Sequence, residues 1–396
     1  MTEKKSSLVD QLRGATKLAV EATKNVTTVV EKMHHTIAGG PDLLGRPLEE
    51  LSKLFAGPTY SAIRGVTSVV GAGLDLALRK LQPVLDQAGA DRGAVLAALN
   101  GVIGDYLAET GNPLAITMKL TSQVEPLELT KESLAAKFPA GGKLLVLVHG
   151  SSMDDTQWLR RGHDHGAALA AERGFIPLYL RYNSGLHISQ NGRAFSALLE
   201  QLVSAWPRPV EEVVLLGHSM GGLVARSACH TAEAEGHAWR QKLRTLVTLG
   251  SPHHGAPLER GGNWFEMLLG VSRYSAPLSR LGQLRSAGVT DLRYGNVLDE
   301  HWEGKDRFAK EGDPRGELNL PEGVQCFAIA ATNSPTLVEP LSGDGLVPVD
   351  SALGRHPDPA RALEFGESHR WISPATTHLD LLDSKAVYAK LLEWLA

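Results

Sequence analysis

The chain has 396 residues, of which 43% are hydrophobic and 21% are charged, values typical of a globular protein. Its 40 basic and 44 acidic residues nearly balance, and no stripe of lysine and arginine is present, which argues against a nucleic-acid partner. No run approaches the roughly 18 apolar residues that a membrane-spanning helix needs.

The first part of the chain, residues 1–110, is predicted to be a helical region. Residues 1–7 are polar and lead into an amphipathic segment, unlike a signal peptide, so we expect a cytoplasmic protein. Apolar residues recur on one helical face over residues 8–33, and further helices are expected over 61–81 and 94–107. These helices are expected to pack on the rest of the protein or on each other. A coiled-coil dimer seam and a peripheral contact of the first helix with a membrane or lipid surface remain alternatives, and the oligomeric state is left open.

From residue 111 onward, strand and helix patterns alternate. Strands are predicted over 144–148, 176–180, 213–216, 243–249 and 324–330, and a last helix over 384–395. This alternation predicts an α/β domain over residues 111–396 with a doubly wound, mostly parallel sheet. The irregular stretch 257–321 is expected to be an insertion that forms a lid. Cys229 and Cys326 share no metal or redox spacing and are expected to be isolated buried thiols.

The segment Gly217-His218-Ser219-Met220-Gly221 lies between a predicted strand and a predicted helix. A serine on such a sharp turn is a nucleophile elbow, in which the turn lifts the hydroxyl clear of the sheet. Glycines two positions to either side remove side chains that would collide where the chain reverses. We therefore predict that Ser219 is the nucleophile of an enzyme.

A serine hydroxyl needs a base to accept its proton, and a triad of this type follows the order serine, acid, histidine. His378, in a loop near the C-terminus, fits the base best, and His369 is the alternative. Asp344, on a glycine-flanked turn, fits the acid that would orient the imidazole. Asp350 is the alternative acid, and Asp344 could instead be an ordinary turn aspartate.

An oxyanion hole requires two backbone N–H groups. One is expected from Met220, the residue after the nucleophile, and the other from Ser151 in the glycine loop that follows the strand 144–148. The turn after the strand 176–180 contains Asn183 and His187, for which we weigh contact with substrate against an ordinary polar turn.

Several motifs follow one another along residues 140–396, namely His149-Gly150, Gly217-His218-Ser219-Met220-Gly221-Gly222, Leu249-Gly250-Ser251-Pro252-His253-His254-Gly255, Gly343-Asp344-Gly345 and His378-Leu379-Asp380. Together they resemble the lipase and esterase branch of the α/β-hydrolases, including bacterial triacylglycerol lipases and the GPI inositol-deacylase-like group. The resemblance implies an α/β-hydrolase fold with Ser219, Asp344 and His378 as the triad. It also implies that the segment containing His253 lies beside the active site, where this residue could contact substrate. Some bacterial lipases of this type hold calcium near the aspartate that corresponds to Asp380, whereas others do without it, and we expect neither a metal nor another cofactor.

These residues predict a serine hydrolase that cleaves carboxylic esters, with a small-molecule or lipid ester as substrate. An acyltransferase, a thioesterase or an amidase would use the same elbow and triad. A non-catalytic interaction protein built on a hydrolase scaffold is the alternative from another class.

Overall fold

The computed structural model describes residues 92–256, 285–305, 313, 315–316, 319–338 and 341–396. The chain divides into two compact units, residues 1–95 with 272–283, and residues 96–271 with 284–396. The second unit holds the described strands and nearly all of the described helices. The predicted helices over 8–33 and 61–81, and residues 257–284 of the predicted lid, lie outside the described residues. The boundaries predicted for the two regions, 1–110 and 111–396, therefore stay predictions.

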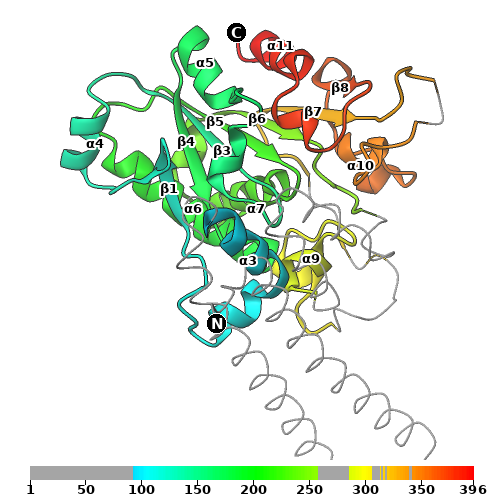
Figure 1. Cartoon of the computed structure of the whole chain (residues 1–396), viewed down its shortest axis with the longest axis horizontal. Coiled ribbons are helices and arrows are strands. Elements are labelled where there is room, and N and C mark those ends of the chain that lie inside the picture. The colour runs from blue at the N-terminus through cyan, green and yellow to red at the C-terminus, as the bar shows by residue number, and fades with distance from the viewer. Residues whose placement is uncertain (1–91, 257–284, 306–312, 314, 317–318, 339–340) are drawn as a thin grey trace, which may run out of the picture. The chain divides into compact units, whose positions relative to one another are not determined.

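An eight-stranded sheet forms the centre of the second unit, in the order β2-β1-β4-β3-β5-β6-β7-β8 (Figure 1). Its six parallel strands are β3 (Lys143–Val148), β4 (Ile176–Arg181), β5 (Glu212–His218), β6 (Leu243–Leu249), β7 (Gln325–Ala331) and β8 (Arg370–Ser373). At one edge, β1 (Lys119–Ser122) runs antiparallel to β4 and pairs with the short β2 (Glu125–Pro126). The predicted fold class, a doubly wound and mostly parallel α/β sheet, is confirmed.

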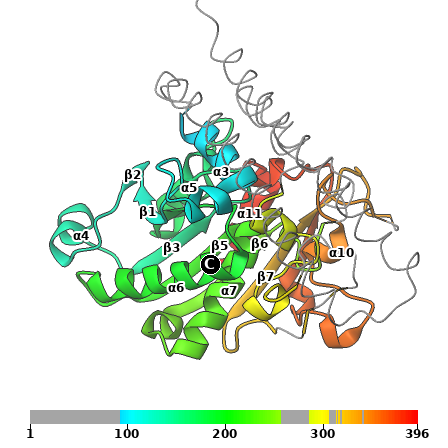
Figure 2. The same cartoon turned by 90° about the horizontal axis from the view of Figure 1, so that it is seen from below.

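Helices cover both faces of this sheet (Figures 1 and 2). On one face lie α6 (Ile188–Ala205) and α7 (Met220–Glu235), and on the other lie α5 (His165–Arg173) and α11 (Lys385–Trp394). The shorter helices are α4 (Lys131–Lys137), α9 (Ala287–Asp291) and α10 (Val349–Ala352). The sequence located the five predicted strands and the last helix to within a few residues, but it did not anticipate the antiparallel edge or β8.

The side chains of β3 point alternately to the two faces of the sheet, which explains why the predicted apolar run of this strand is unbroken. Leu144 and Val146 belong to the core beneath α6 and α7, whereas Leu145 and Leu147 belong to the core beneath α5 and α11. All four side chains are fully buried, because successive side chains of a strand point to opposite faces and both faces are covered.

Local capping interactions set the ends of the covering helices. Asp164 accepts a hydrogen bond from the N–H of Ala167 at the start of α5, and Ser384 accepts one from Val387 at the start of α11. Gly174 ends α5 in the left-handed conformation that glycine adopts without strain. No helix of the described residues is long and apolar enough to cross a membrane.

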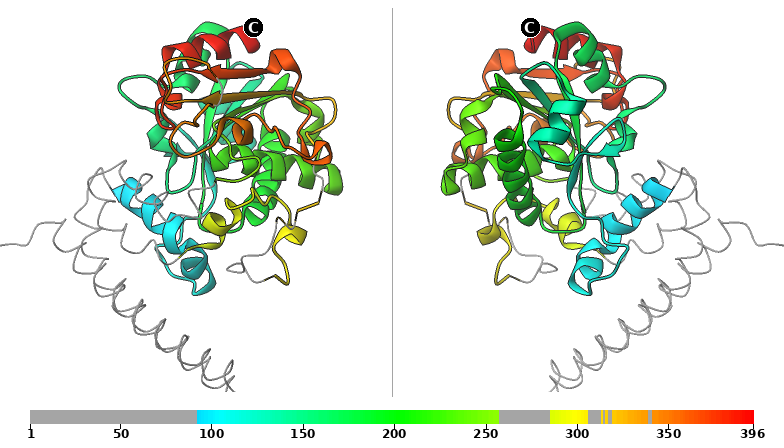
Figure 3. Two further views of the ribbon diagram at one scale, coloured as in Figure 1. Left: turned by 90° about the vertical axis from the view of Figure 1, so that its right-hand side faces the viewer. Right: turned by 90° about the vertical axis from the view of Figure 1, so that its left-hand side faces the viewer.

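Helix α3 (Arg92–Glu109) confirms the helix predicted over 94–107, and its residues 96–109 lie beside α9 at the carboxyl ends of the strands (Figures 1 and 3). Two glycines of α3 allow the helix to pack closely against Ser152 and Asn183. A Cβ added at Gly101 would lie 2.0 Å from Oγ of Ser152, and one added at Gly104 would lie 1.9 Å from Oδ1 of Asn183. Asn183 Nδ2 donates to the carbonyl of Gly104 at 2.8 Å, and Ser286 Oγ donates to the carbonyl of Gly101 at 2.6 Å.

We predict that Gly104→Ala lowers the free energy of unfolding by about 1–3 kcal/mol, the usual cost of overpacking a close contact. Asn183 cannot easily yield, because its amide is hydrogen-bonded to Gly104 and to the N–H of Gly185. Urea denaturation followed by tryptophan fluorescence measures the effect. The exposed Ala108→Ser variant on the same helix is the control and should change stability by no more than about 0.5 kcal/mol. Equal stability of the two variants would contradict the predicted close fit.

Candidate active site

The turn between β5 and α7 holds Ser219 in a backbone conformation that side chains rarely adopt. Its φ is 54° and its ψ is −124°, and a conformation of this kind costs about 1–3 kcal/mol. Its N–H donates to the carbonyl of Leu249 at 2.8 Å, which fixes the turn against the end of β6. The predicted strand–turn–helix context of the serine is confirmed.

The glycines of this turn are required by space. A Cβ added at Gly221 would lie 2.1 Å from the carbonyl oxygen of Val148, and one added at Gly217 would lie 2.5 Å from Cα of Gly222. The start of α7 therefore crosses directly over the end of β3. Any larger residue would push the serine turn away from the sheet.

Asp344 and His378 form a buried pair in loops that follow β7 and β8. His378 Nδ1 donates to Asp344 Oδ2 at 2.7 Å, and each residue is 2% exposed. The other carboxylate oxygen, Oδ1, accepts the N–H groups of Leu346 at 2.9 Å and Val347 at 2.8 Å. With its proton on Nδ1, the imidazole has a bare Nε2 that can accept a proton.

The serine turn and the acid–base pair meet around Gly250, the residue after β6. A Cβ added at Gly250 would lie 3.1 Å from Asp344 Oδ2 and 3.2 Å from His378 Nδ1. His218, which precedes the serine, donates from Nε2 to the backbone carbonyl of His378 at 3.0 Å. Burial holds the pKa of His218 well below its usual value, so the ring stays neutral in this role.

The reactive atoms of Ser219 and His378 are buried but not engaged with the protein. Among the described residues, neither Ser219 Oγ nor His378 Nε2 has a hydrogen-bond partner. Catalytic hydrogen bonds are often long in a free enzyme and shorten when substrate binds. Ser219 is only 1% exposed, so substrate must displace part of the surrounding cover to reach it.

The alternative base and acid lie elsewhere. His369 precedes β8, at the opposite end of that strand from His378, and its Nδ1 contacts the carbonyl oxygen of Cys326 at 3.1 Å. Asp350 has a side chain that is 72% exposed and is paired with Arg355. The structure thus brings Asp344 and His378 together, and neither His369 nor Asp350 joins them.

The loop after β3 lies against the serine turn, where an oxyanion hole would be needed. A Cβ added at Gly150 would lie 3.0 Å from Cβ of Ser219. Ser151 and Met220 are fully buried, and neither of their N–H groups donates to another residue in the described part of the chain. Two unused donors beside the nucleophile suit the stabilisation of a developing oxyanion.

Two of the three residues considered for substrate contact bind other parts of the protein. The amide of Asn183 is hydrogen-bonded to Gly104 and Gly185. His187 stacks on Trp302 with ring centroids 3.6 Å apart, and its Nδ1 lies 3.0 Å from Asp291 Oδ2. Both residues therefore hold the ends of strands and helices together, and the sequence alone offered no sign of these distant partners.

The third residue, His253, is fully buried, with Arg226 Nη1 at 3.3 Å from its Nδ1 and Thr248 Oγ1 at 3.3 Å from its Nε2. Since the guanidinium can only donate, the imidazole accepts at Nδ1 and holds its proton on Nε2. Burial, followed by Arg226, keeps the pKa of His253 well below its usual value. The contacts of this ring are with the protein itself.

Asp380, the residue considered as a calcium ligand, is paired with two arginines. Its Oδ1 pairs with Arg161 at 3.0 Å and with Arg160 at 3.6 Å, and its Oδ2 accepts from the hydroxyl of Thr377. Two arginines oppose a divalent cation, which prefers several oxygen ligands. The described residues contain no group of three or more histidine, cysteine or acidic side chains that could hold a metal.

The two cysteines are free and buried, as expected from their spacing. Burial raises the pKa of Cys326 to about 12 and that of Cys229 still further. Such thiols stay protonated and unreactive at neutral pH.

The parallel strand order, the serine turn after β5, the acid after β7 and the histidine after β8 are the defining features of one fold. It is the α/β-hydrolase fold. In keeping with the resemblance to this fold, a family model described as "PGAP1-like alpha/beta domain" matches residues 188–311. This stretch includes Ser219 and ends before Asp344 and His378.

Several solved structures are similar to the chain at low identity. The mature lipase BlEst2 of Bacillus licheniformis is 17% identical, with 71% of this chain and 98% of that chain covered and a TM-score of 0.43. The esterase Pf2001 of Pyrococcus furiosus is 13% identical, with 65% of this chain and 83% of that chain covered and a TM-score of 0.39. RedJ, a thioesterase of prodiginine biosynthesis in Streptomyces coelicolor, is 15% identical, with 65% of this chain and 91% of that chain covered and a TM-score of 0.35. No curated protein matches the sequence.

We predict that Asp344→Asn lowers kcat for ester hydrolysis by about 10⁴-fold, because an amide no longer fixes the proton of His378 on Nδ1. Asp350→Asn is the matched control, since that carboxylate is exposed, and it should leave kcat within about twofold. Steady-state kinetics with a soluble ester measures both variants. If kcat fell to a similar extent in both variants, or did not fall in Asp344→Asn, Asp344 would not be the acid of the site.

Proposed function

We propose that this protein is a serine hydrolase that cleaves carboxylic esters of small molecules or lipids through an acyl-enzyme on Ser219. The observation that carries the proposal is the buried 2.7 Å hydrogen bond between His378 and Asp344, beside a serine held on a strained strand–helix turn. Together these features supply a nucleophile, a base and an orienting acid in one site.

The reaction follows from these positions. Ser219 Oγ attacks the ester carbonyl carbon while His378 Nε2 accepts the hydroxyl proton. The N–H groups of Ser151 and Met220 stabilise the oxyanion, and Asp344 stabilises the imidazolium. His378 then donates the proton to the leaving alcohol. Water, activated by the same imidazole, attacks the acyl-enzyme and releases the acid.

The test is covalent labelling of the full chain by a fluorophosphonate, with the labelled residue located by mass spectrometry. We expect stoichiometric labelling of Ser219, and no labelling or ester hydrolysis in Ser219→Ala. Ser204→Ala, which changes an exposed serine on α6, is the control and should label like the unmodified protein. Folded protein that takes up no probe would favour the non-catalytic scaffold instead.

The substrate class is tested separately with p-nitrophenyl esters of increasing acyl length, with and without detergent. The resemblance to lipases leads us to expect that hydrolysis continues at long acyl chains. Activity confined to short chains would contradict a lipid substrate and leave a general esterase. Faster transfer to an added alcohol, thiol or amine than to water would identify an acyltransferase. A preference for thioesters would identify a thioesterase, and a preference for amides would identify an amidase.

We further propose that residues 257–321 form a lid and that the protein is cytoplasmic. Packing of the first helix on the rest of the protein is the leading hypothesis, and its contact with a lipid surface stays an alternative. The contacts of residues 285–305 support the proposal of a lid. The N–H of Gly288 donates to the carbonyl of Gly185, and Ser286 Oγ donates to the carbonyl of Gly101 in α3. The segment therefore packs at the carboxyl ends of the strands, where the serine lies.

A further inference from the structure

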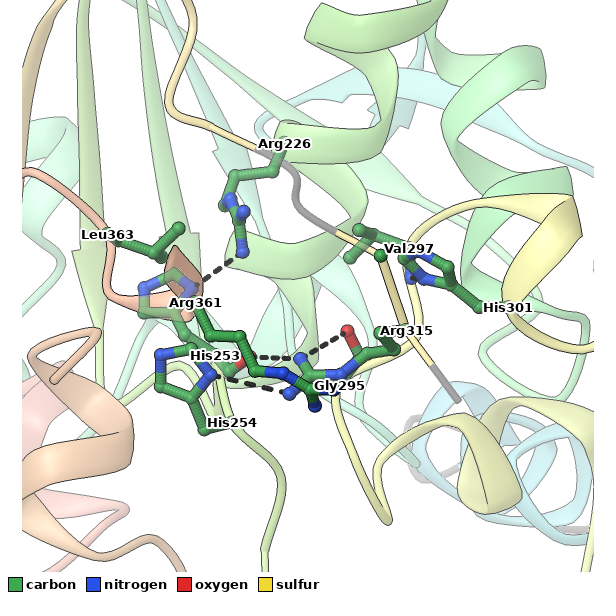
Figure 4. Close-up of a pocket in the computed structure, with 10 residues that line it drawn as sticks. Arg226, His253, His254, Gly295, Val297, His301, Arg315, Arg361 and Leu363 are labelled. Atoms are coloured by element: carbon green, nitrogen blue, oxygen red, sulfur yellow. Dashed lines mark hydrogen bonds between the residues drawn. The ribbon is translucent and has the colours of Figure 1, made fainter. Parts of the chain in front are cut away.

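One pocket, which includes no described residue of the triad or of the oxyanion loop, is rich in arginine and histidine side chains (Figure 4). Its polar side chains are Arg226, Arg315, Arg361, His253, His254 and His301. Gly295, Val297, Gly316 and Leu363 complete the described wall, and none of the lining residues that the structure describes is acidic. Three guanidinium groups and three imidazoles thus face a single small volume.

Arg315 is the framework of this pocket. Its Nη1 donates to the carbonyl of His253 at 2.7 Å, and its Nη2 donates to Asp313 Oδ2 at 2.7 Å. The same carboxylate oxygen of Asp313 lies 2.9 Å from Nη1 of Arg361. Two arginines therefore share this carboxylate, and Nε of Arg361 also lies 3.7 Å from Asp358 Oδ2.

His301 lines the pocket and carries a donor that no other described residue uses. It is 2% exposed, and its Nδ1 accepts the N–H of Val297 at 3.2 Å, so the neutral ring has its proton on Nε2. Within the described residues, this Nε2 has no hydrogen-bond partner. A buried donor without an acceptor costs free energy that a bound acceptor would recover.

Burial and a neighbouring arginine both disfavour the charged forms of three lining side chains. Burial first, and then Arg315, lowers the pKa of His301 to about 4, that of His254 to about 4 and that of Arg226 to about 10. A negative charge in the pocket would oppose each of these shifts.

We propose that this pocket binds the oxygen atoms of a phosphate group, which arrives as inorganic phosphate or as a phosphate monoester. Guanidinium groups match the geometry of phosphate oxygens, and the Nε2 proton of His301 supplies a further donor. The pocket volume of about 20 Å³ is a little larger than one water molecule needs, so it admits oxygen atoms of the ligand and leaves the remainder at its mouth. Neither the proposed hydrolysis nor its residues enter into this binding.

The experiment uses full-length Ser219→Ala protein with labelled histidine rings, titrated with inorganic phosphate and, separately, with glycerol 3-phosphate at constant ionic strength. We expect saturable NMR shifts of the His301 and His254 ring signals, with sodium chloride as the control for ionic strength. Tighter binding of inorganic phosphate would identify the free ion as the ligand, and tighter binding of glycerol 3-phosphate would identify a monoester. No saturable shift with either would overturn the proposal. Because the variant lacks the nucleophile, the result is independent of whether the protein hydrolyses esters.

Substitutions of single arginines test whether phosphate binds in this pocket. Arg361→Gln should raise the Kd for phosphate about tenfold or more through loss of a charged donor, and Arg361→Lys should recover part of it. Arg355→Gln is the matched control, since this exposed arginine pairs with Asp350 outside the pocket, and its Kd should be unchanged. Equal Kd values for Arg361→Gln and Arg355→Gln would show that phosphate binds elsewhere.

Discussion

The crossing of the first turn of α7 over the end of β3 is the contact on which the rest of the site depends. Gly221 approaches the carbonyl of Val148 so closely that no Cβ fits between them. This crossing holds Ser219 in its strained conformation, with its N–H bonded to the end of β6. The strain of a few kcal/mol is sustained because buried parallel strands and α7 fix both ends of the turn.

The same close packing encloses the nucleophile. Gly101 and Gly104 let α3 approach the loop of Ser152 and the turn of Asn183, and Ser286 ties the segment before α9 to α3. Ser219, Asp344 and His378 are also almost fully buried. Burial strengthens the electrostatic interaction between Asp344 and His378, and a substrate of the proposed reaction would reach Ser219 only through movement of the covering elements.

Periodicity and motif order were sufficient to predict the five parallel strands β3 to β7, the serine turn and the residues now found around it. Leu144 to Val148 form an unbroken apolar run because the strand is covered on both faces, and that pattern is visible in one dimension. The edge strands β1, β2 and β8 were missed, because they are short and their residues are mixed in polarity. The roles of Asn183, His187 and His253 were also hidden, because each contacts residues from distant parts of the chain as well as near ones.

The sequence by itself determined the pattern on which the proposed chemistry rests: a serine between glycines, followed in order by an acid and a histidine, within an alternating pattern of strands and helices. Only the tertiary structure shows that His378 and Asp344 lie together, whereas His369 and Asp350 lie apart from them. That arrangement depends on which end of β8 each histidine occupies and on which carboxylate is buried beside the ring. The pocket around Arg226, Arg315 and Arg361 likewise exists only in three dimensions, because residues more than one hundred positions apart supply its charges.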